Sequence, residues 1–176
     1  MKQFNPEIEE SNLLRLAYQI CVAARTAPKG KGKDLLETLV LTGNDKCELS
    51  QKMCDISSRD GLAFFARDAG NVDTSQVVVL VGSRKEPLGI PCCGFCGFKD
   101  CDAMQNAGGT CSFNSTDLGI AVGSAVSCAA DLRLDNRIMY SAGKAAIELG
   151  MFSTDIEMAY AVPLSVSGKS PFFDRG

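Results

Sequence analysis

The sequence contains no histidine and no tryptophan among its 176 residues. The absence of histidine excludes a Ser-His-Asp triad, a Cys-His protease pair and a histidine-ligated zinc enzyme site. Long apolar runs are also absent. The longest candidate, residues 118–130, is only 13 residues long and rich in Gly, Ala and Ser, whereas a membrane-spanning helix needs about 20 apolar residues. We therefore expect no membrane-spanning segment.

The chain also lacks a large excess of charge of either sign. The chain has 18 Lys and Arg against 21 Asp and Glu, a formal net charge of −3, and no long basic stripe. We therefore expect no nucleic-acid partner. Residues 1–10 lack the apolar segment of a signal peptide, so we expect the protein to be cytoplasmic.

Apolar spacing and breaker residues predict helices that alternate irregularly with short strands. We predict helices over 6–25, 46–69, 115–132 and 136–149, and strands over 35–41, 77–81 and 156–166. Asn5 is expected to cap the first helix, Gly61 to break the second, and residues 115–117 to cap the third. This order predicts a single α+β domain over residues 1–176, with a small mixed or antiparallel sheet flanked by helices.

Cysteine is abundant, with nine residues. Four of them follow the spacing C-x2-C-x4-C-x9-C, and Cys92 stands directly before them. The four are Cys93, Cys96, Cys101 and Cys111. They lie in residues 83–114, where Gly, Pro and Cys accumulate and apolar periodicity vanishes, so we predict an irregular cysteine-rich loop.

Thiolates are soft donors that bind iron–sulfur clusters and zinc. Glycines 94 and 97 allow the backbone to curl around such a group. Structural zinc sites usually show two C-x2-C pairs, whereas the second half of this motif has the wider x9 gap. The pattern therefore favours an iron–sulfur cluster, with a structural four-cysteine zinc site and redox-active thiols as alternatives.

The stretch CGFCGFKDC is similar to the C-G-x-C-G-x-x-x-C signature of small four-iron ferredoxin domains, such as those in corrinoid and acetyl-CoA-pathway proteins. The resemblance implies that Cys93, Cys96 and Cys101 are the first three ligands of a [4Fe-4S] cluster. Those domains place their fourth cysteine further along the chain. We predict Cys111 as the fourth ligand here, with Cys92 and Cys128 in reserve.

A larger part of the chain resembles a family of uncharacterised prokaryotic proteins described as containing a ferredoxin domain. The matching stretches are ARTAPKGKGKD, the cysteine motif and the C-terminal half ending in PLSVSGKSPFFDR. This resemblance implies a cluster and brings no established activity.

Residues 25–33 form a basic, glycine-containing loop. Its cations are Arg25, Lys29, Lys31 and Lys33. Such a loop is either a solvated surface or a phosphate grip, in which backbone N–H groups join the cations around an anion.

The stretch AARTAP and residues 118–152 resemble the loop and the alanine-rich helices of nitroreductase-type FMN enzymes, which are α+β homodimers with FMN at the dimer interface. The resemblance implies that fold, a homodimer and FMN. The FMN phosphate would face Arg25, Lys29 and Lys31, together with Lys169 or Arg175. The Arg-x-Ser-x-Arg pattern of those enzymes is missing, and Lys29 stands where they usually have serine.

A flavin accepts two electrons as hydride, whereas an iron–sulfur cluster passes one electron at a time. An electron relay between them needs no protein acid or base, which agrees with the absence of histidine. We predict an iron–sulfur redox protein that acts in electron transfer or as an oxidoreductase, with a redox protein or a small molecule as its electron partner. The alternatives are a pure electron carrier without flavin and a structural zinc-binding protein.

Overall fold

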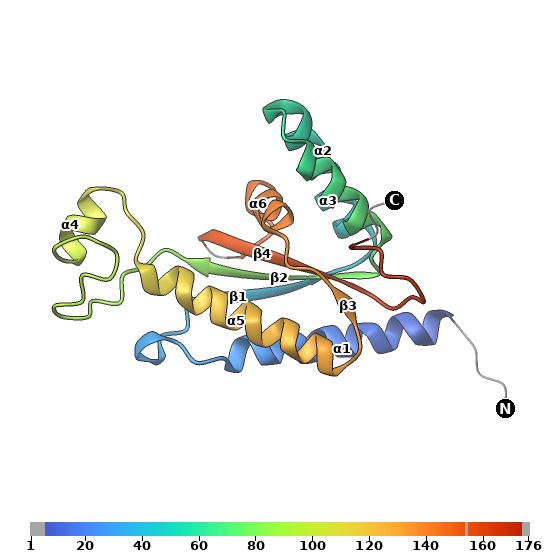
Figure 1. Cartoon of the computed structure of the whole chain (residues 1–176), viewed down its shortest axis with the longest axis horizontal. Coiled ribbons are helices and arrows are strands. Elements are labelled where there is room, and N and C mark those ends of the chain that lie inside the picture. The colour runs from blue at the N-terminus through green and yellow to red at the C-terminus, as the bar shows by residue number, and fades with distance from the viewer. Residues whose placement is uncertain (1–5, 154, 174–176) are drawn as a thin grey trace.

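The computed structural model describes residues 6–153 and 155–173, so Asn5 and Arg175 lie outside the described residues. An antiparallel sheet with the strand order β1-β2-β4-β3 runs through the molecule, with helices on both faces (Figure 1). Its strands are β1 (Leu36–Leu41), β2 (Val77–Arg84), β3 (Asp135–Asn136) and β4 (Ile156–Ser165). This arrangement confirms the predicted α+β fold.

The helices divide between the two faces of the sheet (Figure 1). One face carries α1 (Pro6–Thr26) and α5 (Ser112–Asp131), and the other carries α2 (Gly43–Asp60), α3 (Ala63–Thr74) and α6 (Tyr140–Glu148). A short turn, η1 (Gly30–Gly32), follows α1, and α4 (Cys101–Asn106) lies in the segment that projects past one end of the sheet. None of the helices in the described part of the chain is long and apolar enough to cross a membrane.

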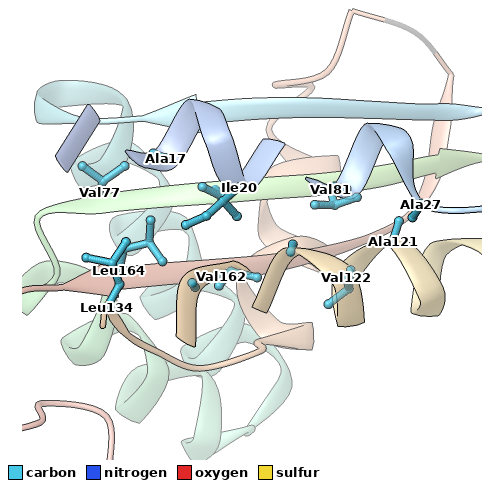
Figure 2. Packing of buried hydrophobic residues seen from close by; sticks show 14 of the residues in the cluster. Ala17, Ile20, Ala27, Val77, Val81, Ala121, Val122, Leu134, Val162 and Leu164 are labelled. Atoms are coloured by element: carbon cyan, nitrogen blue, oxygen red, sulfur yellow. The ribbon is translucent and has the colours of Figure 1, made fainter. Parts of the chain in front are cut away.

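The core is organised by β2, whose first five residues are apolar and fully buried. Successive side chains of a strand point to opposite faces of a sheet. Val77, Val79 and Val81 therefore pack beneath α1 and α5 (Figure 2), whereas Val78 and Leu80 pack beneath α2, α3 and α6. The valine-rich run thus behaves as the buried strand that the sequence predicts.

Two predicted helices differ from the structure at their ends. The predicted helix over 46–69 is two helices, separated at Gly61, which has a φ of 68° and ends α2 as expected. The second of them continues to Thr74, five residues past the predicted end. The predicted helix over 136–149 begins only at Tyr140, because residues 135–136 pair with β4 instead.

The predicted start of the third helix, with its cap at residues 115–117, is wrong. Helix α5 begins at Ser112, and Cys111 occupies the position before it. The hydroxyl groups of Ser115 and Thr116 donate hydrogen bonds of 3.0 and 2.8 Å to the carbonyl of Ser112, inside the first turn. These side chains therefore bond within the helix rather than cap its start.

Candidate functional site

Five cysteines line one cavity of about 260 Å³ beyond the end of the sheet, around α4. They are Cys92, Cys93, Cys96, Cys101 and Cys111. The structure therefore brings the four predicted ligands together with Cys92. Cys128 lies on α5, 17 residues beyond Cys111, which stands directly before that helix. At 1.5 Å per residue the two are about 25 Å apart, so Cys128 is too far away to serve as a reserve ligand.

The cysteines are arranged by depth. Cys111 is 8% exposed, Cys96 and Cys101 are half-buried, and Cys92 and Cys93 are exposed at the mouth of the cavity. Apolar side chains complete the walls, among them Leu88, Phe98, Met104 and Phe113. A group bound in the cavity would thus be screened from water on its inner side and open to solvent on its outer side.

Two glycines shape the turn that carries Cys93 and Cys96. Gly94 and Gly97 have φ values of 57° and 84°, a region that favours glycine because it has no Cβ. The N–H of Gly97 donates a 2.9 Å hydrogen bond to the carbonyl of Gly94 and closes the turn. The backbone thus curls at the two positions that the sequence predicts.

Helix ends position the other two predicted ligands. Cys101 is the first residue of α4, a helix absent from the predicted irregular loop. The carboxylate of Asp100 caps it by accepting a 2.8 Å hydrogen bond from the N–H of Ala103. Cys111 stands at the start of the 20-residue helix α5. The positive end of that helix dipole attracts a negatively charged group bound beside it.

Asn114 fixes the chain that leads from β2 into the cavity. Its side chain is 1% exposed. Its amide nitrogen donates a 2.8 Å hydrogen bond to the carbonyl of Glu86, and its amide oxygen accepts a 3.1 Å bond from the N–H of Glu86. Both polar atoms are therefore satisfied by one backbone residue, which holds that segment against the first turn of α5.

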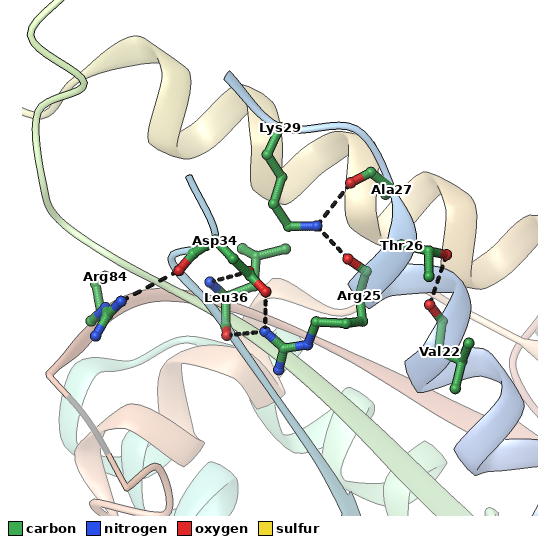
Figure 3. Close-up of polar contacts among 8 residues, drawn as sticks. All are labelled: Val22, Arg25, Thr26, Ala27, Lys29, Asp34, Leu36 and Arg84. Carbon is green, nitrogen blue, oxygen red and sulfur yellow. Dashed lines mark hydrogen bonds and ion pairs between the residues drawn. The ribbon is translucent and has the colours of Figure 1, made fainter. Parts of the chain in front are cut away.

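The cations of the basic loop have partners within the chain, and Figure 3 shows those of Arg25 and Lys29. Lys29 Nζ donates hydrogen bonds of 2.6 and 2.8 Å to the carbonyls of Arg25 and Ala27, at the negative end of α1. Lys31 Nζ donates a 3.1 Å bond to the carbonyl of Leu88, and Lys33 forms an ion pair with Glu86. The predicted phosphate contacts of Lys29 and Lys31 stay predictions, and a phosphate would compete with these bonds.

Arg25 also forms hydrogen bonds within the chain. Its Nη1 lies 2.7 Å from Asp34 Oδ2 and 2.7 Å from the carbonyl oxygen of Leu36 (Figure 3). Desolvation opposes ionisation of Asp34, but the hydrogen bond and the charge of Arg25 outweigh it and keep the pKa of Asp34 below its ordinary value. Arg25 therefore ties the end of α1 to the start of β1.

The basic loop packs against the wall of the cysteine cavity. The N–H of Gly30 donates to both carboxylate oxygens of Asp117, at 3.1 and 3.0 Å, and Asp117 is only 7% exposed. A Cβ added to Gly30 would lie 2.4 Å from Leu88 Cδ1, so the two segments are in close contact. The basic loop and the cysteine-rich segment, which are separate motifs in the sequence, thus meet at Leu88.

Lys169 lies away from the basic loop. It follows the end of β4 by four residues, at the end of the sheet where β2 begins. Arg25 bonds to Leu36, which pairs with Ser83 near the other end of β2. The ends of β2 are about 20 Å apart at 3.3 Å per residue. One chain therefore does not bring Lys169 and Arg25 together.

The cysteine side chains do not close on a single point. Within residues 6–153 and 155–173, no three Cys, Asp or Glu side chains are placed to hold one metal ion. All four predicted ligand residues nevertheless line the same cavity.

Comparison with known sequences gives two matches. The model of a family described as uncharacterised proteins containing a ferredoxin domain matches residues 107–175. An uncharacterised protein of Archaeoglobus fulgidus is 42% identical over 161 residues, which cover 87% of this chain and 86% of that protein.

Solved structures show the same fold at low sequence identity. An FMN-dependent nitroreductase from Mycobacterium smegmatis, solved in complex with NADPH, has a TM-score of 0.61 at 7% identity and covers 88% of this chain and 78% of its own. A nitroreductase from Desulfovibrio desulfuricans in complex with FMN has a TM-score of 0.58 at 14% identity, covering 89% and 75%. The fold is therefore nitroreductase-like, as the sequence predicts.

Proposed function

This chain belongs to the family of uncharacterised proteins that contain a ferredoxin domain, and on that premise we propose that it is an iron–sulfur redox protein. Cys93, Cys96, Cys101 and Cys111 hold a [4Fe-4S] cluster. The observation that carries the proposal is that these four thiols, drawn from a turn and two helix starts, line one cavity.

The donor arrangement suits a cluster better than a single zinc ion. Tetrahedral zinc binds four sulfurs at about 2.3 Å, which sets the sulfurs roughly 3.8 Å apart. A cluster distributes its cysteine ligands over several iron atoms, and the four cysteines line one cavity of about 260 Å³.

The chain supplies a helix start and an apolar wall to such a group. A [4Fe-4S] cluster, when bound, provides one-electron transfer. The positive end of the α5 dipole attracts a negatively charged group bound beside it. The side chains of Phe98 and Phe113 exclude water from the inner wall, and the 64% exposed ring of Phe95 stands at the rim, 5.6 Å from that of Phe113. Burial of this kind tunes a cluster's potential.

FMN is a second proposed cofactor, which would make the protein a flavin and iron–sulfur oxidoreductase. It is supported by the nitroreductase-like fold, since the Desulfovibrio desulfuricans protein of that fold was solved in complex with FMN. Arg25, Lys29, Lys31 and Lys169 are the proposed phosphate contacts, drawn from two chains because one chain keeps Lys169 apart from the others.

We also propose that the protein is a homodimer, because the exposed face of α5 carries no charge between Ser115 and Ala130. The exposed residues of α5 between Ser115 and Ala130 include no charged side chain, whereas the solvent face of a surface helix is ordinarily polar and charged. Sedimentation velocity of the unmodified protein should give the mass of two chains. The variant Gly123→Lys, on that face, should give the mass of a single chain. Ser58→Lys, on the exposed side of α2, should leave the dimer intact. A monomeric unmodified protein would contradict the proposal.

The ultraviolet–visible spectrum of protein purified without oxygen, before and after dithionite, tests the function. We expect a broad brown absorption that bleaches on reduction, because thiolate-bound iron absorbs through charge transfer. Resolved yellow bands on top of it would indicate bound flavin, and their absence would leave a pure electron carrier. A colourless protein containing zinc would overturn the redox function in favour of a structural site.

A further inference from the structure

A second cavity of about 270 Å³ lies at the open edge of β4, between that strand, α6 and the start of α5. The residues around it are Ser115, Leu118, Tyr140, Lys144, Ile147 and residues 157–160. It lies at this edge because β3 pairs only with residues 164–165 of β4. The edge beside residues 157–160 is therefore uncovered by any strand of the described chain.

The lining combines an apolar floor with the polar groups of the two tyrosines, Ser115, Lys144 and Glu157, and the Glu157 carboxylate is paired with Lys85 at 3.6 Å. Leu118, Ile147 and Met158 supply apolar surface, and two aromatic rings, those of Tyr140 and Tyr160, stand beside it. Hydrogen-bond donors are available from the two phenol groups and from Lys144. Sites for small molecules are typically of this kind, mostly apolar with a small number of polar groups that fix orientation. The cavity suits a flat, apolar ring that carries hydrogen-bond acceptors.

Size restricts the ligand further. Cavities that hold drug-sized molecules usually measure roughly 300–1,000 Å³. A volume of about 270 Å³ lies just below that range. One or two fused rings therefore fit better than a long or branched molecule.

A third cavity lies between the second cavity and the cysteine cavity. A further cavity of about 230 Å³ shares Cys111 with the cysteine cavity and Glu157 with the second cavity. Ser115, at the edge of the second cavity, lies four residues after Cys111 on α5, about 6 Å along the helix. A ring bound there would thus be one helical turn from a proposed cluster ligand.

We propose that the cavity between α6 and β4 binds a diffusible quinone-class electron acceptor, an inference that rests on the proposed iron–sulfur function. In the reaction the two C=O groups of the ring become two C–OH groups, which takes two electrons and two protons. The protons come from water at the open mouth of the cavity. The two electrons come from a one-electron reductant, a reduced ferredoxin-type protein, which delivers them one at a time by way of the cysteine cavity.

Intrinsic fluorescence tests the binding directly. The chain has three tyrosines and no tryptophan, and two of the tyrosines line this cavity. Titration with menadione, a two-ring quinone, should quench the tyrosine fluorescence to a saturating level. Tyr140→Leu should raise the dissociation constant about tenfold through loss of ring stacking. Tyr18→Leu removes a 59% exposed tyrosine of α1 and should leave the constant unchanged.

The outcomes separate this inference from the proposed function. The assignment would be overturned if menadione did not quench the fluorescence, or if both substitutions weakened menadione binding equally. It would also be overturned if a flavin were retained stoichiometrically in this cavity and excluded menadione. The protein is reduced with dithionite, separated from excess dithionite and mixed with menadione. Its oxidised absorbance should then return, and the return should be slower in Tyr140→Leu. Cluster-free Cys111→Ser protein should still bind menadione. Binding without any cluster in the unmodified protein would refute only the iron–sulfur function and the electron route.

Discussion

Serine in place of any one of Cys93, Cys96, Cys101 or Cys111 is expected to remove nearly all the iron and acid-labile sulfide from the anaerobically purified protein. Serine keeps the shape of the side chain but replaces a soft, readily ionised sulfur with a hard, weakly acidic oxygen. Three remaining thiolates hold a four-iron cluster poorly. The measurements are iron and sulfide per chain, together with the bleachable absorption.

The structure supplies two matched controls for this series. Cys128→Ser changes a half-buried cysteine on α5 that lies outside the cavity, so it should keep the full cluster. Cys92→Ser changes the fifth cysteine of the cavity and should also keep it, if the four ligands are as proposed. A full cluster in all four ligand variants would refute the site, and loss in Cys92→Ser with retention in Cys111→Ser would make Cys92 the fourth ligand.

The cysteine motif is predictable from sequence because its chemistry is local. One residue type supplies every donor, and the four donors span fewer than 20 residues, so any compact folding of the segment brings them near one another. The sheet is predictable for a comparable reason. The run Val77–Val81 is apolar at every position, and only a strand covered on both faces buries it completely.

The contacts that support the cavity have no local signal. The bond from Gly30 to Asp117 spans 87 residues, and no pattern in the sequence pairs them. Asn114 and Glu86 present the same difficulty over 28 residues. The two tyrosines of the second cavity also come from separate elements, α6 and β4.

Local signals also mislead where a distant partner takes the side chain. Residues 115–117 have the composition of a helix cap, but Asp117 is drawn to the basic loop and the helix starts earlier. The basic loop shows its charge in the sequence but not its partners. Lys29 and Arg25 bond mainly to backbone carbonyl oxygens. Every residue has such an oxygen, so the sequence gives no sign of which one is the partner.

Gly143→Ala is expected to lower the free energy of unfolding by about 3 kcal/mol, as overpacking at rigid sites does. Helix propensity alone predicts the opposite, a gain of about 1 kcal/mol for alanine over glycine inside a helix. The clash decides the sign. A Cβ at residue 143 would lie 2.0 Å from the carbonyl oxygen of Ala159 and 2.9 Å from the Cα of Tyr160. Both are backbone atoms of β4 and cannot rotate away.

Gly70→Ala is the matched control, because Gly70 lies inside α3 with nothing within 4 Å of an added Cβ. It should raise the urea midpoint slightly, whereas Gly143→Ala should lower it strongly at an unchanged denaturant slope. Equal or greater stability of Gly143→Ala would show that α6 does not seat closely on β4. Because Tyr140 and Lys144 stand on α6 and face β4 across the second cavity, displacement of α6 by Gly143→Ala should weaken menadione binding as well.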